Sequence, residues 1–288
     1  MSDNLLLSHG PSRAEVSQIG AELMSWTVDG RERIWGGDPA YWPRRAPILF
    51  PVCGWMNGGV LRAKGRVIPC GVHGFGSDAA FRLTRVAENS LRATLSDTAD
   101  TRAAFPFAFA LAIDITLEDR AVRYSFEVTN PGDEPLPFAL GFHPGFVWPF
   151  DGGRKDDYVV EFERAETPFS PKIAPGGLFT DEMLPVPFAG QRLNILDGLD
   201  RPDALVLRNA NSRRVRFIAP SGRALGVEME HFPHWVFWSR PGGDYLCIEG
   251  WTGHGDPVGF TGDITDKPGQ ILLPPGGRSR HTYRCWLE

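Results

Sequence analysis

Short runs of alternating apolar and polar residues, each ended by a turn signal, dominate this sequence of 288 residues. The clearest run is Ala121–Thr129, in which every second residue is apolar and which the turn-forming segment Asn130–Asp133 follows. Period two with turns every eight to twelve positions is typical of an antiparallel β-protein. The same pattern recurs in seven further runs: Ala14–Ile19, Ser90–Leu95, Phe107–Leu117, Asp157–Phe162, Ala204–Leu207, Ser212–Ile218 and Trp235–Trp238.

Helical patterns are few, and no strand–helix–strand rhythm appears that would indicate a parallel sheet. We predict single helical turns at Pro39–Trp42 and Thr180–Met183 only. Glycine and proline together make up about a fifth of the chain, against roughly 12% in average proteins, which disfavours a helical bundle. The turn-rich segment Asp151–Asp157 is a candidate boundary, but strands of similar composition flank it. We therefore predict one large antiparallel β-sandwich domain over residues 1–288, in the all-β class.

Charge and hydropathy narrow the possible partners and compartment. The formal net charge is −5, which argues against a nucleic-acid surface, because such a surface needs a basic stripe. No apolar run approaches the ~20 residues that a membrane helix needs. The N-terminal segment has no basic start followed by a long apolar stretch, so we expect a cytoplasmic protein without a secretory signal. The four scattered cysteines then read as free thiols.

Four glycine-rich segments combine titratable or aromatic side chains with residues that allow close approach of a ligand. His143 is a candidate acid or base because the pKa of imidazole lies near neutrality; the alternative is a core histidine bonded to a carbonyl. Glu249 is a candidate base if it is buried, and otherwise an outward strand residue. His73 allows the same two interpretations. The segments are Ala46–Gly59, Val72–Gly76, Phe138–Trp148 and Leu246–Asp256.

Two short motifs have a spacing known from metal sites, but neither supports a metal site here. In His231-x-x-His234 the two side chains would point to opposite faces of a strand. Cys70-x-x-His73 has zinc-like spacing but lacks a partner pair. We therefore predict no bound metal.

Tryptophans concentrate near the four segments and favour a flat, polar-rimmed ligand such as a sugar, whose C–H face stacks on aromatic rings. Core filling must still explain most of them. The six are Trp42, Trp55, Trp148, Trp235, Trp238 and Trp251.

The four segments, in this order, resemble the aldose 1-epimerase (galactose mutarotase-like) family, most closely its bacterial branch. The residues that carry the resemblance are APILFPVCG, HGF, NPGDEPLPFALGFHPGF, CIEGWTGHGD and KPGQILLPPGGR. It implies a large β-sandwich and interconversion of the α and β anomers of an aldose, without metal or organic cofactor. His143 matches the family's general acid, Glu249 its general base, and His73 a residue that holds the sugar.

The chain also departs from the family pattern. Trp55 and Ser77 stand where the family usually has arginines, which argues against a phosphorylated substrate, since arginine favours bidentate anion binding. Gly145 replaces a tyrosine or alanine, and Gly250 replaces a proline. Arg44 or Arg45 are candidates to compensate.

Three further residues, Trp55, Asp203 and Trp251, are candidates to bind the sugar. Two other functions stay open: a non-catalytic sugar-binding or sensor protein on the same fold, and another carbohydrate enzyme such as a glycosidase or lyase. The expected partner is a small sugar, and we expect a monomer or a homodimer.

Overall fold

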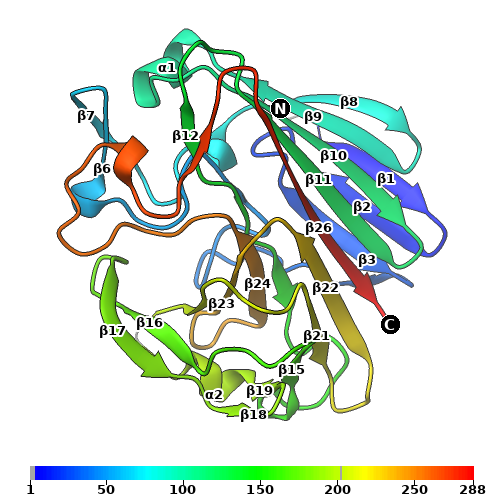
Figure 1. The fold of residues 1–288 in the computed structure, drawn as a ribbon. Coiled ribbons are helices and arrows are strands. Elements are labelled where there is room, and N and C mark those ends of the chain that lie inside the picture. Colours follow the sequence, from blue (N-terminus) through cyan, green and yellow to red (C-terminus); the bar gives the residue numbers. More distant parts are fainter. Residues whose placement is uncertain (1–3, 202) are drawn as a thin grey trace.

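A ten-stranded antiparallel sheet is the largest element of the computed structural model, which describes residues 4–201 and 203–288 (Figure 1). From one edge to the other it runs through β18 (Phe188–Ala189), β19 (Arg192–Asn194), β15 (Val159–Phe162), β21 (Arg214–Ile218), β22 (Ala224–Glu230), β26 (Arg278–Leu287), β11 (Ala121–Thr129), β10 (Ala110–Glu118), β9 (Ser90–Ser96) and β8 (Arg82–Ala87).

A six-stranded antiparallel sheet packs against the ten-stranded sheet. The Phe142 ring stacks on the Tyr124 ring with centroids 4.4 Å apart, and the Tyr283 hydroxyl donates to the Ile248 carbonyl at 2.6 Å. One face of the smaller sheet therefore belongs to the main core, and the other face is free to carry a site. Its strands are β20 (Leu205–Leu207), β23 (His234–Trp238), β24 (Tyr245–Trp251), β13 (Gly141–Phe142) and β5 (Ile48–Leu49), with β14 (Gly145–Val147) also paired to β24.

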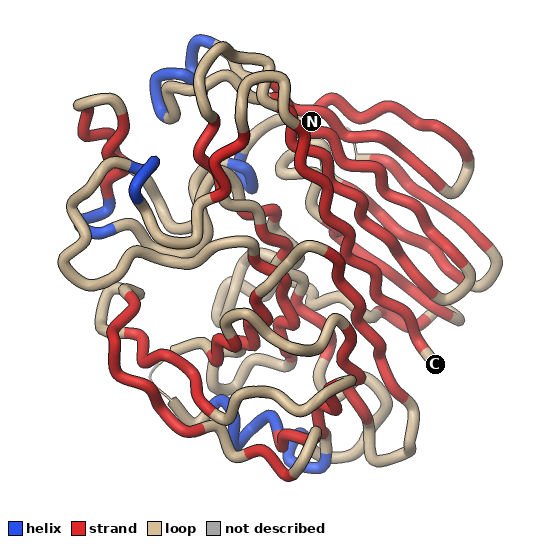
Figure 2. Tube along the Cα trace, in the orientation of Figure 1, coloured by secondary structure: helices blue, strands red, loops and turns tan. Residues whose placement is uncertain are grey.

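Smaller sheets and short helices complete the molecule (Figure 2). A four-stranded sheet comprises β1 (Leu5–His9), β2 (Ser12–Val16), β3 (Leu23–Val28) and β4 (Arg31–Glu32). Three two-stranded sheets pair β6 (Val60–Ala63) with β7 (Arg66–Pro69), β12 (Leu136–Phe138) with β25 (Ile271–Leu273), and β16 (Phe169–Ile173) with β17 (Phe179–Pro185). Single 3₁₀ turns lie at Asn57–Gly59, Gly76–Asp78, Lys155–Asp157 and Ile264–Asp266.

The predicted all-β class is confirmed, with 47% of residues in strands and 8% in helices. Each of the eight predicted runs contains a strand, although the ends shift by a few residues. The run Ala121–Thr129 matches β11 residue for residue. By contrast, β2 ends at Val16, and Ile19 forms only an isolated bridge with Ala80.

Of the two predicted helical turns, Thr180–Met183 is wrong, whereas Pro39–Trp42 forms a single isolated turn. Thr180–Met183 lies inside β17, where pairing with β16 supplies the backbone hydrogen bonds. Pro39–Trp42 forms a turn that closes when the Tyr41 and Trp42 N–H groups donate to the Asp38 carbonyl. Tertiary pairing overrides weak local propensity at Thr180–Met183.

The two α-helices in the described part of the chain were not predicted. Helix α1 (Ala99–Ala104) begins with a capping box at Thr98, and α2 (Ile195–Leu199) begins at Asn194, whose side chain accepts from the Leu196 N–H. Both are too short for a helical apolar period to appear.

In the described part of the chain, no helix is long and apolar enough to cross a membrane. The four cysteines are free thiols, as expected; Cys70 is half-buried and the other three are buried.

Candidate active site

The strand β24 carries the centre of the candidate site on its odd-numbered residues. Strand residues alternate between faces, so while Ile248 points into the main core, Cys247, Glu249 and Trp251 point to the opposite face. On β23 the residue opposite Cys247 is Trp238. We call this face of the six-stranded sheet the site face.

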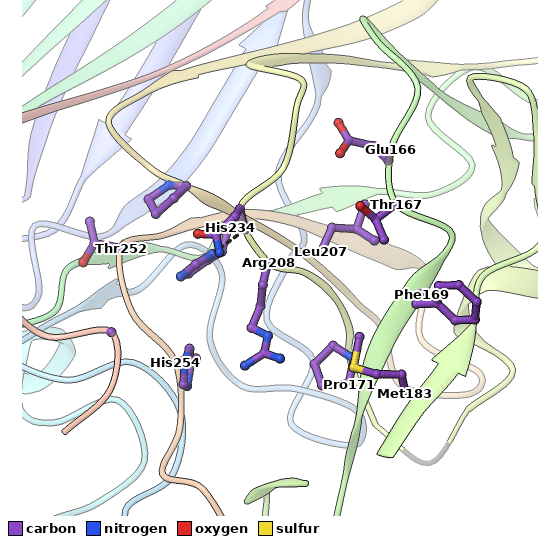
Figure 3. A pocket seen from close by; sticks show the side chains of 13 residues that line it. Glu166, Thr167, Phe169, Pro171, Met183, Leu207, Arg208, His234, Thr252 and His254 are labelled. Atoms are coloured by element: carbon purple, nitrogen blue, oxygen red, sulfur yellow. Dashed lines mark hydrogen bonds between the residues drawn. The ribbon is translucent and has the colours of Figure 1, made fainter. Parts of the chain in front are cut away.

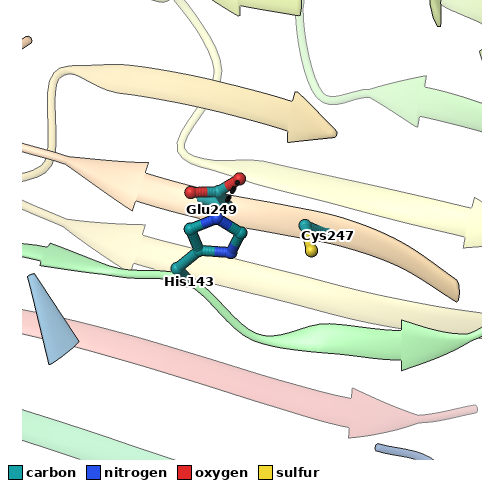
Figure 4. A group of neighbouring side chains, drawn as sticks. All are labelled: His143, Cys247 and Glu249. Carbon is teal, nitrogen blue, oxygen red and sulfur yellow. Dashed lines mark ion pairs between the residues drawn. The ribbon is translucent and has the colours of Figure 1, made fainter. Parts of the chain in front are cut away.

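The register of β13 brings His143 to Glu249. Gly141 pairs with Trp251 and Phe142 with Gly250, so the next position along this register sets His143 opposite Glu249. His143 Nε2 lies 3.4 Å from Glu249 Oε1, and the two side chains are only 8% and 1% exposed. Figure 4 shows the imidazole ring directed at the carboxyl group. The structure thus brings together the two residues that the sequence singled out as acid and base.

Burial controls the protonation of this pair. It lowers the pKa of His143 well below its ordinary value, and the nearby His73 adds to the shift. It raises the pKa of Glu249 well above its ordinary value; the Trp251 hydrogen bond opposes this shift and the Asp203 carboxylate adds to it. Desolvation disfavours both charged forms. Burial therefore favours the neutral forms, an imidazole beside a protonated carboxyl group, which together hold as many protons as an imidazolium–carboxylate pair.

Aromatic rings surround His143 on the site face. The Trp42 ring stacks on His143 with centroids 4.8 Å apart and planes 27° apart. Trp238 meets the imidazole edge-on at 5.8 Å, and Trp251 donates its indole N–H to Glu249 Oε2 at 2.8 Å. Of the six tryptophans near the predicted segments, these three lie at the site. Trp148 and Trp235, in contrast, are buried in the main core.

Two glycines that depart from the family pattern have a structural reason. A Cβ on Gly145 would lie 2.8 Å from Trp42 Cζ3, so the glycine makes room for the indole that stacks on His143. A Cβ on Gly250 would lie 2.8 Å from Met229 Sδ and 3.1 Å from Phe232 Cγ. Gly250 therefore serves tight packing on the core face.

His73 reaches the pair from a strained turn. Its φ is +66°, a left-handed conformation uncommon for residues with a side chain. His73 Nδ1 accepts from the Gly54 N–H at 3.0 Å. Its ring stands edge-on to His143 at 5.7 Å and to Trp251 at 5.3 Å. Burial lowers the pKa of His73 to about 4, so it is neutral near pH 7.

Two predicted sugar-binding residues lie at the margin of the site. Trp55 is 44% exposed, and its ring lies against Gly177, between β16 and β17, so closely that a Cβ there would overlap it. Asp203 is exposed, and its carboxylate accepts from the Ala204 N–H at 2.8 Å. The negative charge of the Asp203 carboxylate helps to raise the pKa of Glu249.

Neither arginine offered as compensation serves the pair. Arg44 pairs with Asp78 and lies 3.8 Å from Glu22. Arg45 donates to the Gly36 and Met24 carbonyls. Both are committed to loops near the four-stranded sheet.

A separate cavity of about 580 Å³ is lined by none of the predicted site residues (Figure 3). One part of its lining is polar, with Arg208, His234 and His254; another is apolar, with Phe169 and Met183. The size is ordinary for a small-molecule site. Sequence reasoning missed this cavity because its residues come from six separate segments.

The spacing His231-x-x-His234 does not form a pair. His231 is exposed, whereas the buried His234 accepts from the Asn209 N–H through Nδ1.

Comparisons with known proteins identify the family and the fold. The family model for aldose 1-epimerase matches residues 3–286. Protein LacX, chromosomal, from Lactococcus lactis subsp. lactis is 31% identical over 277 residues, which cover 92% of this chain and 93% of that protein.

Two solved structures share nearly the whole fold. A galactose mutarotase-like protein from Lactobacillus casei superposes with a TM-score of 0.92 at 28% identity, covering 99% of this chain and 100% of its own. A galactose mutarotase related enzyme from Lactobacillus acidophilus gives a TM-score of 0.91 at 26% identity, covering 99% and 97%. The family model and the shared fold agree, and the chain belongs to the aldose 1-epimerase family.

Proposed function

We propose that this protein is a sugar 1-epimerase in which Glu249 is the general base and His143 the general acid. The observation that carries the proposal is the buried His143–Glu249 pair, with Nε2 and Oε1 3.4 Å apart at neighbouring strand positions. General acid–base catalysis needs both groups within hydrogen-bond reach of the atoms that exchange protons. The anomeric oxygen and the ring oxygen of an aldose are bonded to the same carbon, so two adjacent groups can reach both.

Ring opening is a double proton transfer. The Glu249 carboxylate takes the proton of the anomeric hydroxyl while the His143 imidazolium protonates the ring oxygen, and the bond from C1 to the ring oxygen breaks. The pair then holds a neutral imidazole and a protonated carboxyl group. Rotation about C1–C2 presents the other face of the carbonyl, and the reverse transfers close the ring as the other anomer.

The neutral pair that burial favours is the state that ring opening produces and from which ring closing starts. Burial favours the neutral pair, which differs from the ionic pair only by one proton moved between the partners. Hydroxyl groups of a bound sugar would stabilise the ionic form by hydrogen bonding. His73 is a further polar contact for the sugar, and the rings of Trp42, Trp238 and Trp251 are candidates to stack on its C–H face.

A non-catalytic sugar-binding protein is the second candidate. Two observations favour it: the pair is almost fully buried, and Arg44 and Arg45 are bonded elsewhere. A glycosidase would need a second carboxylate at ~5–10 Å from Glu249, and Asp203 is the residue to test for that role.

Proton NMR of freshly dissolved α-anomers distinguishes these functions. Purified protein is added to a panel of free aldoses and one aldose phosphate, and the approach to anomeric equilibrium is compared with buffer. The expected result is acceleration in proportion to protein concentration for at least one free aldose. Sugar binding without acceleration would select the sensor, and release of the alcohol from an aryl glycoside would select the glycosidase.

A further inference from the structure

A third side chain, Cys247, belongs to the His143–Glu249 cluster, and the mechanism above does not use it. Cys247 Sγ, one nitrogen of His143 and one oxygen of Glu249 all lie within 4.8 Å of one another. The three residues are buried, and Cys247 is fully so. They share the site face because residues 247 and 249 are two apart on β24 and His143 continues the β13 register (Figure 4).

The cluster contains a buried carboxyl oxygen that has no hydrogen-bond partner among the described residues. Glu249 Oε2 accepts from the Trp251 indole, but Oε1, which faces His143, has no hydrogen-bond donor among the described residues and is buried. Buried polar atoms are nearly always paired in native proteins, and an exception often marks a place where a ligand or ion belongs. An unpaired carboxyl oxygen next to an imidazole nitrogen and a thiol is such an exception.

We propose that His143, Cys247 and Glu249 form a binding site for a thiophilic divalent cation of the Zn²⁺ class. Thiolate, imidazole and carboxylate are the ligands that zinc takes in proteins. With bonds of about 2.0–2.3 Å in tetrahedral geometry, ligand atoms stand about as far apart as the 3.4 Å between Nε2 and Oε1. The sulfur lies within 4.8 Å of the other two ligand atoms and has to move closer to them on binding, and the three side chains leave the fourth tetrahedral position to another ligand.

Binding exchanges protons for the ion. The S–H bond of Cys247 breaks as the metal–sulfur bond forms, and the proton leaves to solvent; a protonated Glu249 releases its proton in the same way. His143 contributes the lone pair of Nε2. Protons and the cation therefore compete, and affinity rises with pH.

The consequence for activity rests on the proposed function. A cation on His143 and Glu249 occupies the lone pairs that the proton transfers require, so it inhibits anomerisation in competition with the sugar. The cation is a regulator or inhibitor in this account and takes no part in the reaction.

Titration of the full-length protein with Co²⁺ tests the site without any need for activity, because Co²⁺ bound to thiolate gives a charge-transfer absorption. We expect saturable absorption at one equivalent in the wild type. Cys247→Ser should abolish the charge-transfer band, while the matched Cys70→Ser, which removes the most accessible thiol, should keep it. Absence of a saturable band, or a band lost in Cys70→Ser and kept in Cys247→Ser, would overturn the proposal.

A second variant and a second readout cover the case in which Cys247→Ser does not fold. His143→Ala should weaken Co²⁺ binding by at least the roughly 10–100-fold that loss of a supporting partner costs; unchanged affinity would contradict the site. Where an aldose is turned over, Zn²⁺ but not Mg²⁺ should lower the rate competitively. If the protein binds Co²⁺ but accelerates the anomerisation of no sugar, the proposed function is contradicted while the cation site stands.

Discussion

The two faces of β24 have different roles, although successive residues of the strand alternate between them. Leu246 and Ile248 are fully buried in the main core, whereas Cys247 and Glu249, equally buried, form the polar centre of the site. Burial on the first face stabilises the fold, because it removes apolar surface from water. Burial on the site face shifts the protonation of groups that prefer water. The same desolvation thus supplies stability on one face and reactivity on the other.

The largest expected effect of desolvation is the response to acid of the buried histidines, of which His73 and His143 lie at the site face. Burial lowers the pKa of His73, His234, His254 and His281 to about 4 and that of His143 well below its ordinary value. The unfolded chain binds these protons near pH 6.5 and the folded chain does not. These histidines therefore contribute stability that is fully present above pH 6.5 and is lost as the pH drops toward 4, and the raised pKa of Glu249 opposes this trend in part.

Urea midpoints measured from pH 7.5 to 4.5 check this expectation. Each pKa unit corresponds to about 1.4 kcal/mol per group, so the midpoint should fall steeply over this window. A midpoint that stays constant between pH 6.5 and 4.5 would show that these histidines are not desolvated in the folded protein.

Truncation on the core face should cost stability and spare the chemistry. Ile248→Ala removes a fully buried side chain between the two sheets and should lower the free energy of unfolding by about 2–5 kcal/mol. Val258→Ala, at a residue that is 57% exposed, is the control and should change it by at most about 0.5 kcal/mol. Equal effects from the two variants would contradict the packing described for this face.

Added volume on the core face gives a smaller effect of the same kind. Gly250→Ala would place a methyl group 2.8 Å from Met229 Sδ, and overpacking should cost about 1–3 kcal/mol. Thermal unfolding measures this loss. A rise in melting temperature would mean that the core has spare room next to Gly250.

The matched substitution on the site face, Gly145→Ala, should act mainly on activity. Of the substitutions considered, the control aside, it should have the smallest effect on stability. Gly145→Ala would place a methyl group 2.8 Å from Trp42 Cζ3, which pushes the indole away from His143. We expect an altered tryptophan fluorescence spectrum and a raised KM, with stability less affected than in Gly250→Ala. An unchanged spectrum and KM would remove Trp42 from the account of the site.

The sequence alone predicts the strands better than the site. The alternation of apolar and polar residues locates β11 residue for residue, because one face of this strand packs on the core and the other faces solvent. It misses α1 and α2, which local capping stabilises within a single turn or two. The motifs single out His143 and Glu249, but their separation follows from the pairing of β13 with β24, which no local pattern contains.

The remaining site residues depend on contacts distant in sequence. Trp42 comes from a loop, and its place above His143 requires the glycine at position 145. Cys247 shares a face with Glu249 by simple alternation, so strand parity was the signal that could have found it. Sugar binding by the exposed Trp55 and Asp203 stays a prediction. In the described chain, neither residue makes a hydrogen bond or a ring contact with the His143–Glu249 pair.

The rate constant kcat for anomerisation in the single and double variants of the pair tests the central claim most directly. His143→Ala and Glu249→Gln should each lower kcat by about 10²–10⁴-fold while circular dichroism shows a folded protein. Because the two groups exchange protons as one unit, the double variant should be no slower than the slower single variant. A wild-type kcat in either single variant, or losses that multiply in the double variant, would contradict a coupled acid–base pair.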